Sequence, residues 1–409
     1  MQLTLAALRT ALEGRAAAFR CITSYQPAGG RGAKVFPPTY EGGKYATEQR
    51  VHPGRHDPDT GAPRESACVL LDSVQSQANR MESALLEAQR AGRIELPLLI
   101  TRFDHDALPK PFSVNSLEAP HRVADALFRD STLDGVIFRQ SEAGRILDTS
   151  DVRNAAGLFG LCPTALVFGI WDSTGPRPSL GAKFQRALVS EIVGYDAVQG
   201  KRTRSRIDPA QVVLGAGPLY SSPNDSNEQP HWTLDSKSGG KKLGKDGKGK
   251  PSEANHGNVT PSVSDGGFTI SEGVQTTVLS LAALRRLRFP LAGASESDRQ
   301  IDIAAQTALA AIGLAAAALA REDGDLRSRC QLFPESESCW ELLDRPGHDP
   351  QSFELTPGAA IDLLNQSVDA AKQAGLPWQG VIELQPSEQL VELVRRSQEL
   401  ASAEGGEGD

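Results

Sequence analysis

A run of mostly alanine residues from Ile303 to Ala320 places the strongest constraint on the fold of this chain. The run contains Gln306 and is slightly shorter than the roughly 20 residues that a transmembrane helix needs. We therefore expect a helix that is tightly packed inside the protein, and no membrane partner. The chain can supply a core around it, because hydrophobic residues make up 39% of its 409 residues.

Strand and helix patterns alternate along the chain without the regular period of a doubly wound sheet, which favours an α+β fold with insertions. We expect helices over residues 3–19, 73–90, 121–129, 151–161, 297–320, 356–375 and 387–401. We expect strands over residues 67–71, 94–101, 135–138, 165–171, 267–270, 275–281 and 380–384, and a strand or short helix over 184–193. The clearest buried strand is 165–171.

Three segments are expected to lack regular structure. Residues 21–66 are rich in Gly, Pro, Tyr and His and predict an irregular insertion. Residues 198–262 include the sequence SKSGGKKLGKDGKGK, whose six Lys and five Gly cannot contribute to a core, so we expect a flexible basic insertion. Residues 402–409 form an acidic tail that we expect to be disordered.

The charges of the chain are unevenly distributed. The formal net charge of −8 excludes a globally basic nucleic-acid binder. Residues 183–288, however, carry 15 Lys and Arg against 10 Asp and Glu, so this part has a net charge of +5. Such asymmetry indicates a surface that faces a polyanion. Five cysteines occur without a CxxC pair or a cleavable signal, and we expect reduced thiols in a cytoplasmic protein.

The usual enzymatic motifs are not visible. The sequence has no Walker A motif, no GxGxxG after a strand and no GxSxG. His52 and His56 have an HxxxH spacing, but Pro53 and Gly54 between them favour a solvated loop over a metal site. We therefore expect no catalytic residue, no metal and no cofactor.

The first feature that suits a phosphate backbone is the helix expected after Asp72, which we interpret as its N-cap. The exposed side would carry uncharged donors and one cation, namely Gln75, Ser76, Asn79 and Arg80. Such side chains and the free N–H groups of a helix N-terminus can contact phosphate oxygens. An ordinary solvated face is the alternative.

Two glycine-containing basic segments form the second feature. The segment LGAKFQR contains Lys183, Phe184 and Arg186, where the phenyl ring either stacks on a base or lies in the core. The segment KVFPPTYEGGKY adds Lys34, Tyr40 and Lys44. A plain loop is the alternative for this second segment.

The third feature is a pair of basic stretches. Arg202, Arg204 and Arg206 alternate with small residues, so on an extended segment they would share one face. Each phosphate that they neutralise would release a counterion and make binding salt-dependent. The lysine-rich loop that ends at Lys250 is either part of this surface or a solvated linker, and Arg285, Arg286 and Arg288 can extend it.

Long strings in the chain resemble a known family. The sequence is similar to the backbone subunit of type I-U (also called type I-G) CRISPR Cascade complexes, of the Cas-seven group within the RAMP superfamily. The strings are KVFPPTYEGGKY, LLDSVQSQANRMESALLEA, APHRVADALFRDS, LCPTALVFGIWDSTGP, GAKFQRALVSEIVGYDA, KPSEANHGN, QTTVLSLAALRRLRFP and DLRSRCQL. The resemblance runs from about residue 20 to 330 and more loosely to about 398.

The resemblance implies an RRM-like (ferredoxin-like) palm over residues 1–409 with inserted finger and thumb segments. We take 21–66 as an inserted loop or finger, and infer that the thumb lies within about 198–262; residues 21–66 are the other candidate for the thumb. It also implies a non-catalytic subunit whose copies stack head to tail along one guide RNA, forming a ribonucleoprotein filament for antiviral defence. The implied partners are CRISPR RNA, target DNA through the guide, other copies of the chain, the large and RNA-processing subunits, and a helicase-nuclease.

Together these features give a set of candidate RNA-binding residues: Lys34, Tyr40, Lys44, Gln75, Ser76, Asn79, Arg80, His121, Arg122, Lys183, Phe184, Arg186, Arg202, Arg204, Arg206 and Lys250. One alternative is a metal-independent endoribonuclease of the same superfamily that processes CRISPR RNA. It would use His121 with Lys183 or Arg122 as acid and base. Another is an RNA-guided RNA-cutting enzyme with a loop aspartate, for which Asp72, Asp104 and Asp172 are available.

Overall fold

The computed structural model describes residues 1–173, 181–222, 230–244, 246–292, 294, 296–322 and 326–404. The chain forms two compact units. The first comprises Met1–Phe103, Phe112–Val198 and Phe268–Ser387, and the second Asp104–Pro111, Gln199–Gly267 and Glu388–Asp409. Parts of the expected basic insertion (223–229 and 245) and of the acidic tail (405–409) lie outside the described residues.

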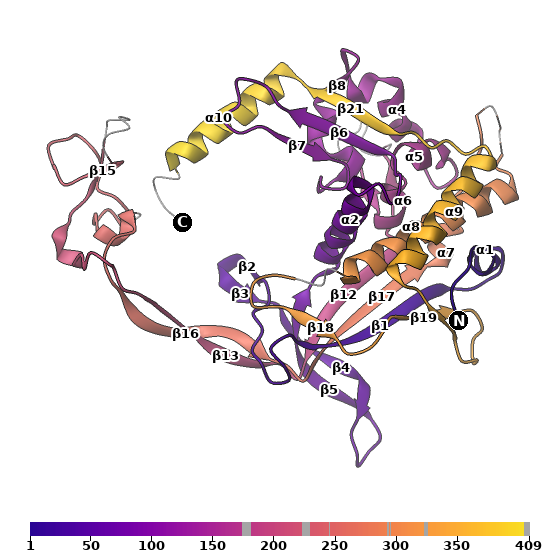
Figure 1. Ribbon diagram of the computed structural model, residues 1–409, viewed down its shortest axis with the longest axis horizontal. Coiled ribbons are helices and arrows are strands. Elements are labelled where there is room, and N and C mark those ends of the chain that lie inside the picture. The colour runs from indigo at the N-terminus through magenta and orange to yellow at the C-terminus, as the bar shows by residue number, and fades with distance from the viewer. Residues whose placement is uncertain are drawn as a thin grey trace. The chain divides into compact units, whose positions relative to one another are not determined.

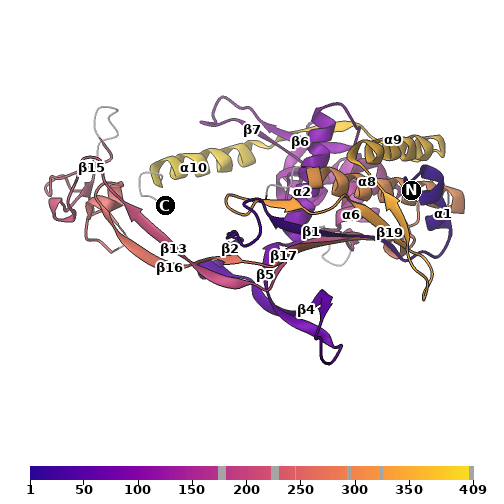
Figure 2. The same ribbon diagram turned by 60° about the horizontal axis from the view of Figure 1, so that its bottom comes forward.

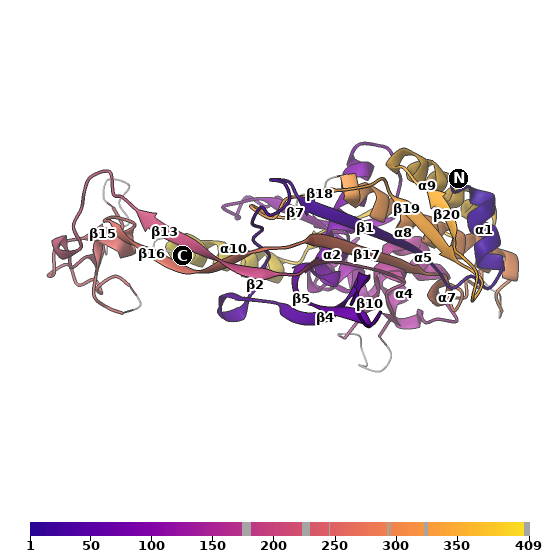
Figure 3. The ribbon, with the colours of Figure 1, turned by 90° about the horizontal axis from the view of Figure 1, so that it is seen from below.

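The first unit contains an eight-stranded antiparallel sheet, the main sheet (Figures 1 and 3). The strands lie in the order β20 (Gln351–Glu354), β19 (Cys339–Leu343), β1 (Ala18–Pro27), β17 (Glu272–Ser280), β12 (Leu188–Tyr195), β5 (Pro63–Asp72) and β4 (Thr47–His56), with β18 (Leu332–Pro334) also paired to β1. Burial alternates along β1, where Phe19, Cys21 and Thr23 are buried and Ile22 is exposed.

The expectation of an irregular segment over 21–66 is therefore wrong for most of its length. Residues 21–27 belong to β1, and β4 and β5 pair as a hairpin. Between β1 and β4 lie only the short elements β2 (Thr39–Tyr40), η1 (Glu41–Gly43) and β3 (Lys44–Tyr45). Pairing with neighbouring strands overrides the Gly- and Pro-rich composition that suggested a loop.

Helix α8 (Arg299–Glu322) occupies the centre of the core, as the alanine-rich run predicts. It packs against β17 and five helices: α1 (Leu5–Glu13), α2 (Val74–Arg90), α6 (Thr164–Phe168), α7 (Leu281–Leu284) and α9 (Pro357–Gln373). Figure 2 shows α8 with α2 and α9 on the same side of the main sheet. Among the described residues α8 alone is long and apolar enough to cross a membrane, and 89% of its apolar window is buried in the protein.

A second sheet of five strands lies in the same unit. Its order is β7 (Phe112–Asn115), β6 (Leu98–Phe103), β21 (Val381–Pro386), β8 (Ser131–Leu133) and β9 (Val136–Ile137), and β21 and β6 are parallel. The short helices around it are η2 (Arg122–Ala124), α3 (Ala126–Arg129), η3 (Phe138–Gln140), α4 (Glu142–Thr149) and α5 (Ala156–Leu161). With both sheets largely antiparallel, the observed mixture of helices and strands is consistent with α+β.

Some expected elements have different forms in the structure. The buried strand expected over 165–171 is wrong, because 164–168 form helix α6 and only β10 (Ile170–Trp171) is extended. A short run of apolar residues has no period that separates a buried strand from a buried helix. The first helix ends at Glu13, where Gly14 closes it, so the expected boundary at 19 is also wrong.

In the second unit, β13 (Val198–Arg206) pairs with β16 (Val259–Thr269). The segment between them contains η4 (Leu214–Ala216), β14 (Tyr220–Ser221), β15 (Trp232–Thr233) and η5 (Pro251–Ala254), and helix α10 (Glu388–Glu404) completes the unit. Leu219 and Leu243 are buried, and the Leu243 N–H donates to the Leu219 carbonyl at 3.0 Å. Leu243 of the lysine-rich segment is thus buried, whereas the flexibility of the segment stays a prediction.

Candidate nucleic-acid interface

The start of helix α2 is fixed by Ser73. Its hydroxyl oxygen accepts a hydrogen bond from the N–H of the half-buried Ser76 at 3.2 Å, so Ser73 is the N-cap and the assignment of Asp72 to that role is wrong. The buried Asp72 carboxylate accepts instead from Gln77 Nε2 at 2.6 Å and from Arg80 Nε at 3.0 Å. The buried Asp72 carboxylate therefore holds the side chains of Gln77 and Arg80 in place on α2.

Arg80 is half-buried rather than projecting into solvent. Besides Asp72, its guanidinium donates to the backbone carbonyl of Leu326, so it ties α2 to the segment that follows α8. Gln75 and Asn79, one turn apart, are exposed, and their side chains bond to none of the described residues. Two uncharged donor groups are therefore available to a ligand along this face of α2.

A small hydrophobic cluster brings the segment around β2 and β3 to the same end of the main sheet. Val35 forms a β-bridge with Phe268, and the Tyr45 ring packs edge-on against the Phe268 ring at 5.0 Å. Leu326, whose carbonyl binds Arg80, belongs to this cluster. Residues far apart in the sequence thus meet beside the start of α2.

Sequence reasoning missed two arginines in this neighbourhood, Arg327 and Arg329. The Arg329 guanidinium lies 3.9 Å from the centre of the Phe36 ring, and the Phe36 N–H donates to the Arg329 carbonyl at 2.8 Å. Arg327 is exposed, and its side chain pairs with no described residue. The alternation of Arg, Ser and Arg in DLRSRCQL was the available signal, but nothing local in the sequence connects it to α2.

We call the resulting group the α2-end surface; its exposed members are Lys34, Tyr40, Lys44, Gln75, Asn79, Arg327 and Arg329. Four are cations, two are amides, and Tyr40 is 47% exposed. Glu41 is the one carboxylate within residues 34–45. The cations and amides can donate to phosphate oxygens, and the tyrosine ring can stack on a base.

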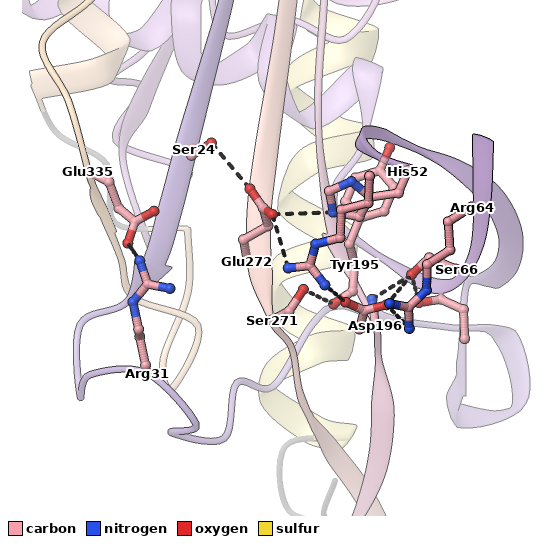
Figure 4. Close-up of polar contacts among 12 residues, drawn as sticks. Ser24, Arg31, His52, Arg64, Ser66, Tyr195, Asp196, Ser271, Glu272 and Glu335 are labelled. Atoms are coloured by element: carbon pink, nitrogen blue, oxygen red, sulfur yellow. Dashed lines mark hydrogen bonds and ion pairs between the residues drawn. The ribbon is translucent and has the colours of Figure 1, made fainter. Parts of the chain in front are cut away.

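Cations near the β4–β5 hairpin have a different environment (Figure 4). We call this group the ionic cluster; it comprises His52, Arg55, Arg64, Asp196 and Glu272. Arg55 donates to Asp196 and lies 3.5 Å from Glu272. Arg64 is 3.9 Å from Asp196, and His52 Nε2 is 3.2 Å from Glu272. Two carboxylates thus balance the two guanidinium groups, which leaves little net positive charge for a polyanion.

Burial and hydrogen bonding both act on the Asp196 carboxyl. Burial raises its pKa, but hydrogen bonds from Ser66 and Ser271 and the nearby guanidinium groups outweigh burial, so the pKa is lowered overall. His52 is buried, with its ring 4.7 Å from the Tyr195 ring, so the expectation of a solvated His52 is wrong. Among the described residues, no group of three or more His, Cys, Asp or Glu side chains can hold a metal.

The LGAKFQR segment forms β11 (Lys183–Phe184), which pairs with β10. Phe184 is buried, so it leaves the candidate surface, and the exposed aromatic residue here is Trp171. Lys183 Nζ lies 5.3 Å from the centre of the Trp171 ring. Arg186 is half-buried and donates to the Phe168 carbonyl at 3.2 Å. Lys183 and Trp171 therefore form a second, smaller exposed patch.

Arg122 is part of the core. Its guanidinium binds Glu82 of α2 through two hydrogen bonds, at 2.6 and 2.8 Å, and donates to the Gly169 carbonyl at 3.0 Å. Burial raises the pKa of the Glu82 carboxyl, although Arg122 opposes this. Because Arg122 is only 8% exposed, it leaves both the candidate surface and the acid–base pair proposed with His121, which is exposed.

In the second unit, β13 is extended, so Arg202, Arg204 and Arg206 point to one face, as their alternation predicts. Arg202 donates to the Ser264 hydroxyl at 3.2 Å, and Arg206 donates to the Gly257 carbonyl at 3.0 Å. Arg204 is exposed and pairs with no described residue. Lys250 Nζ lies 3.3 Å from Asp246, so its charge is partly neutralised.

The three aspartates considered for RNA cutting have different environments. Asp72 is occupied by Gln77 and Arg80, as described above. Asp172 is 2% exposed and lies 2.9 Å from Arg139. Asp104 is an exposed residue of the second unit. The carboxylates of Asp72 and Asp172 are buried and therefore not accessible to a phosphodiester. Among the described residues, no buried acid or base contacts the Asp104 side chain.

A family model described as CRISPR-associated protein GSU0053 matches residues 19–199. A search of curated proteins finds no match. The matched segment runs from β1 to the start of β13, and it includes α2 and the segment around β2 and β3. The match indicates a role in CRISPR defence and, over residues 19–199, confirms the resemblance of the chain to a CRISPR-associated protein family.

Proposed function

We propose that this chain is a non-catalytic RNA-binding backbone subunit of a type I-U (type I-G) Cascade complex. In this proposal, copies stack head to tail along one guide RNA in the cytoplasm, and the guide then pairs with invading DNA. The large subunit, the RNA-processing subunit and the helicase-nuclease are the expected partners. The four deeply buried free cysteines, with Cys339 exposed, are compatible with a reducing compartment.

The order of strands supports an RRM-like palm. Along the chain, β1, α2, β12, β17, α8 and β19 occur in this order with other elements inserted between them, and in the main sheet the four strands lie in the order β19, β1, β17 and β12. A βαββαβ succession of this kind is typical of ferredoxin-like folds. The proposed thumb, within residues 198–262, lies between β12 and β17, and nearly all of this range belongs to the second unit.

The α2-end surface is the observation that carries the proposal. It combines exposed cations with amide donors, both of which can donate to phosphate oxygens. A guide carrier must accept every spacer sequence, so it must bind phosphates and shape rather than bases. The endoribonuclease alternative loses one of its two acid–base pairs, His121 with Arg122, because Arg122 is sequestered by Glu82.

Co-purification tests this function. The full chain is expressed alone and together with its neighbouring genes and a repeat-spacer array, and mass and RNA length are then measured. We expect a large complex that holds RNA of one uniform length. An RNA-free particle of small mass under both conditions would contradict the proposal. A His121→Ala variant that abolishes cleavage of repeat RNA by the isolated chain would favour the nuclease instead.

A further inference from the structure

A cavity of about 210 Å³ lies in the first unit, between the end of α1, the turn after α7 and the start of α8. It is lined by Leu12, Arg285, Arg288, Ser297, Arg299, Asp302, Ile303 and Gln306. Three of these residues are arginines and only one is a carboxylate. The cavity does not include any residue of the α2-end surface, so its chemistry needs a separate explanation.

The single carboxylate, Asp302, is already occupied. Its oxygens accept from the Phe289 N–H at 2.8 Å and from the Ser297 hydroxyl at 3.0 Å. The Arg288 Nε lies 3.5 Å away, so Asp302 balances the charge of Arg288. This leaves the charges of Arg285 and Arg299 without a carboxylate among the residues that line the cavity.

Arg285 is the least satisfied of the three arginines. Its Nη1 is buried and has no hydrogen-bond partner among the described residues. Burial lowers the pKa of Arg285, and no neighbouring carboxylate opposes this effect. Arg299 is exposed at the edge of the cavity, where its Nη2 donates to the Glu13 carbonyl at 3.0 Å. Three guanidinium groups and one occupied carboxylate give the cavity an excess of positive charge, which a bound anion would neutralise.

We propose that this cavity binds a phosphate group. Guanidinium groups bind phosphate through paired, charge-assisted hydrogen bonds, and three of them, Arg285, Arg288 and Arg299, line this cavity. The group can come from free phosphate or from the backbone of a bound RNA, since both present the same oxygens. The proposal goes beyond the proposed RNA-binding function, and its test on the free chain does not require RNA.

Thermal unfolding of the full chain in inorganic phosphate, at constant ionic strength, tests this site. Ligands that bind the folded state raise Tm, and the dependence on concentration gives an apparent Kd. We expect Arg285→Gln to weaken phosphate binding by about tenfold or more, since a hydrogen bond to a charged group is lost. The matched control is Arg345→Gln, whose side chain is 76% exposed outside the cavity, and it should retain wild-type binding.

The proposal would be overturned if phosphate raised the Tm of wild type and of Arg285→Gln equally. It would also be overturned if phosphate did not raise the Tm of wild type, because the cavity would then hold only water. If Arg285→Gln does not fold, Arg299→Glu decides. Glutamate is well tolerated in the first turn of a helix, and here it reverses a charge at the edge of the cavity. We expect this variant to lose the response, and a retained response would contradict the site.

A further arm identifies the source of the phosphate. The titration is repeated on wild type saturated with guide-length RNA. If bound RNA abolishes the rise of Tm with phosphate, the site binds a phosphate of the RNA. If the rise of Tm persists, the site binds free phosphate. Failure to bind RNA would contradict the proposed function but leave the phosphate response of the free chain unchanged, so the two proposals fail separately.

Discussion

The α2-end surface and the ionic cluster both lie near the end of the main sheet where β12 ends and β17 begins, and both contain arginines. In the ionic cluster, Asp196 and Glu272 take up the charges of Arg55 and Arg64. In the α2-end surface, Arg327 has no such partner among the described residues. Pairing, rather than the number of basic residues, therefore decides which region can attract a polyanion.

The largest effect is expected where a cation is fully paired and buried. Replacing Arg122 with Met leaves the Glu82 carboxylate buried and uncompensated, which should lower the free energy of unfolding by about 3–5 kcal/mol. Urea denaturation measures the change. Arg9→Ala breaks an exposed pair with Glu13 and should cost at most about 1 kcal/mol. Similar losses for both variants would contradict the contrast between buried and exposed pairs.

Arg80 tests an intermediate case, since it contacts both Asp72 and the Leu326 carbonyl. Arg80→Ala leaves Gln77 as the remaining side-chain donor to Asp72, so we expect a loss of about 1–3 kcal/mol in the free energy of unfolding. RNA binding by the folded variant should also weaken, equally for unrelated guide sequences. A guide-specific loss of affinity would show that this region reads bases.

The smallest effect is expected in the ionic cluster. Because the pKa of Asp196 is lowered in the folded state, its contribution to stability is present above the ordinary aspartate pKa and is lost as the pH falls through the lowered value. Asp196→Asn should therefore reduce stability near neutral pH by about 1 kcal/mol or less and flatten the acid limb of the pH profile. Denaturation at several pH values measures this. An unchanged acid limb, or weaker RNA binding, would contradict this assignment.

Much of the fold follows from local sequence patterns. The amphipathic spacing predicted α2, and the alanine-rich run predicted α8 and its burial. The hairpin of β4 and β5 could not be predicted, because Pro53 and Gly54 suggested a loop and only pairing with β12 makes the hairpin part of the sheet. Long-range pairing is absent from the local pattern that sequence reasoning uses.

The candidate site was predictable in its parts and not in its assembly. Lys34, Lys44 and Asn79 were identified from sequence and are exposed in the structure. Arg122, identified in the same way, is buried with Glu82, from which it is separated by 40 residues. Arg329 was missed because its contact with Phe36 connects distant parts of the chain. Residue type indicates the chemistry, whereas tertiary contacts decide which side chains remain available.

The central claim is that the exposed cations of the α2-end surface bind the phosphates of the guide RNA. The salt dependence of RNA affinity tests it most directly. The variant with Lys34, Lys44, Arg327 and Arg329 all replaced by Ala is compared with the double variant Arg55→Ala and Arg64→Ala. The fourfold variant should lower the slope of log affinity against log salt by about 3, equally for unrelated guides, and the double variant should change it little. An unchanged slope in the fourfold variant, or an equal change in both, would contradict the account.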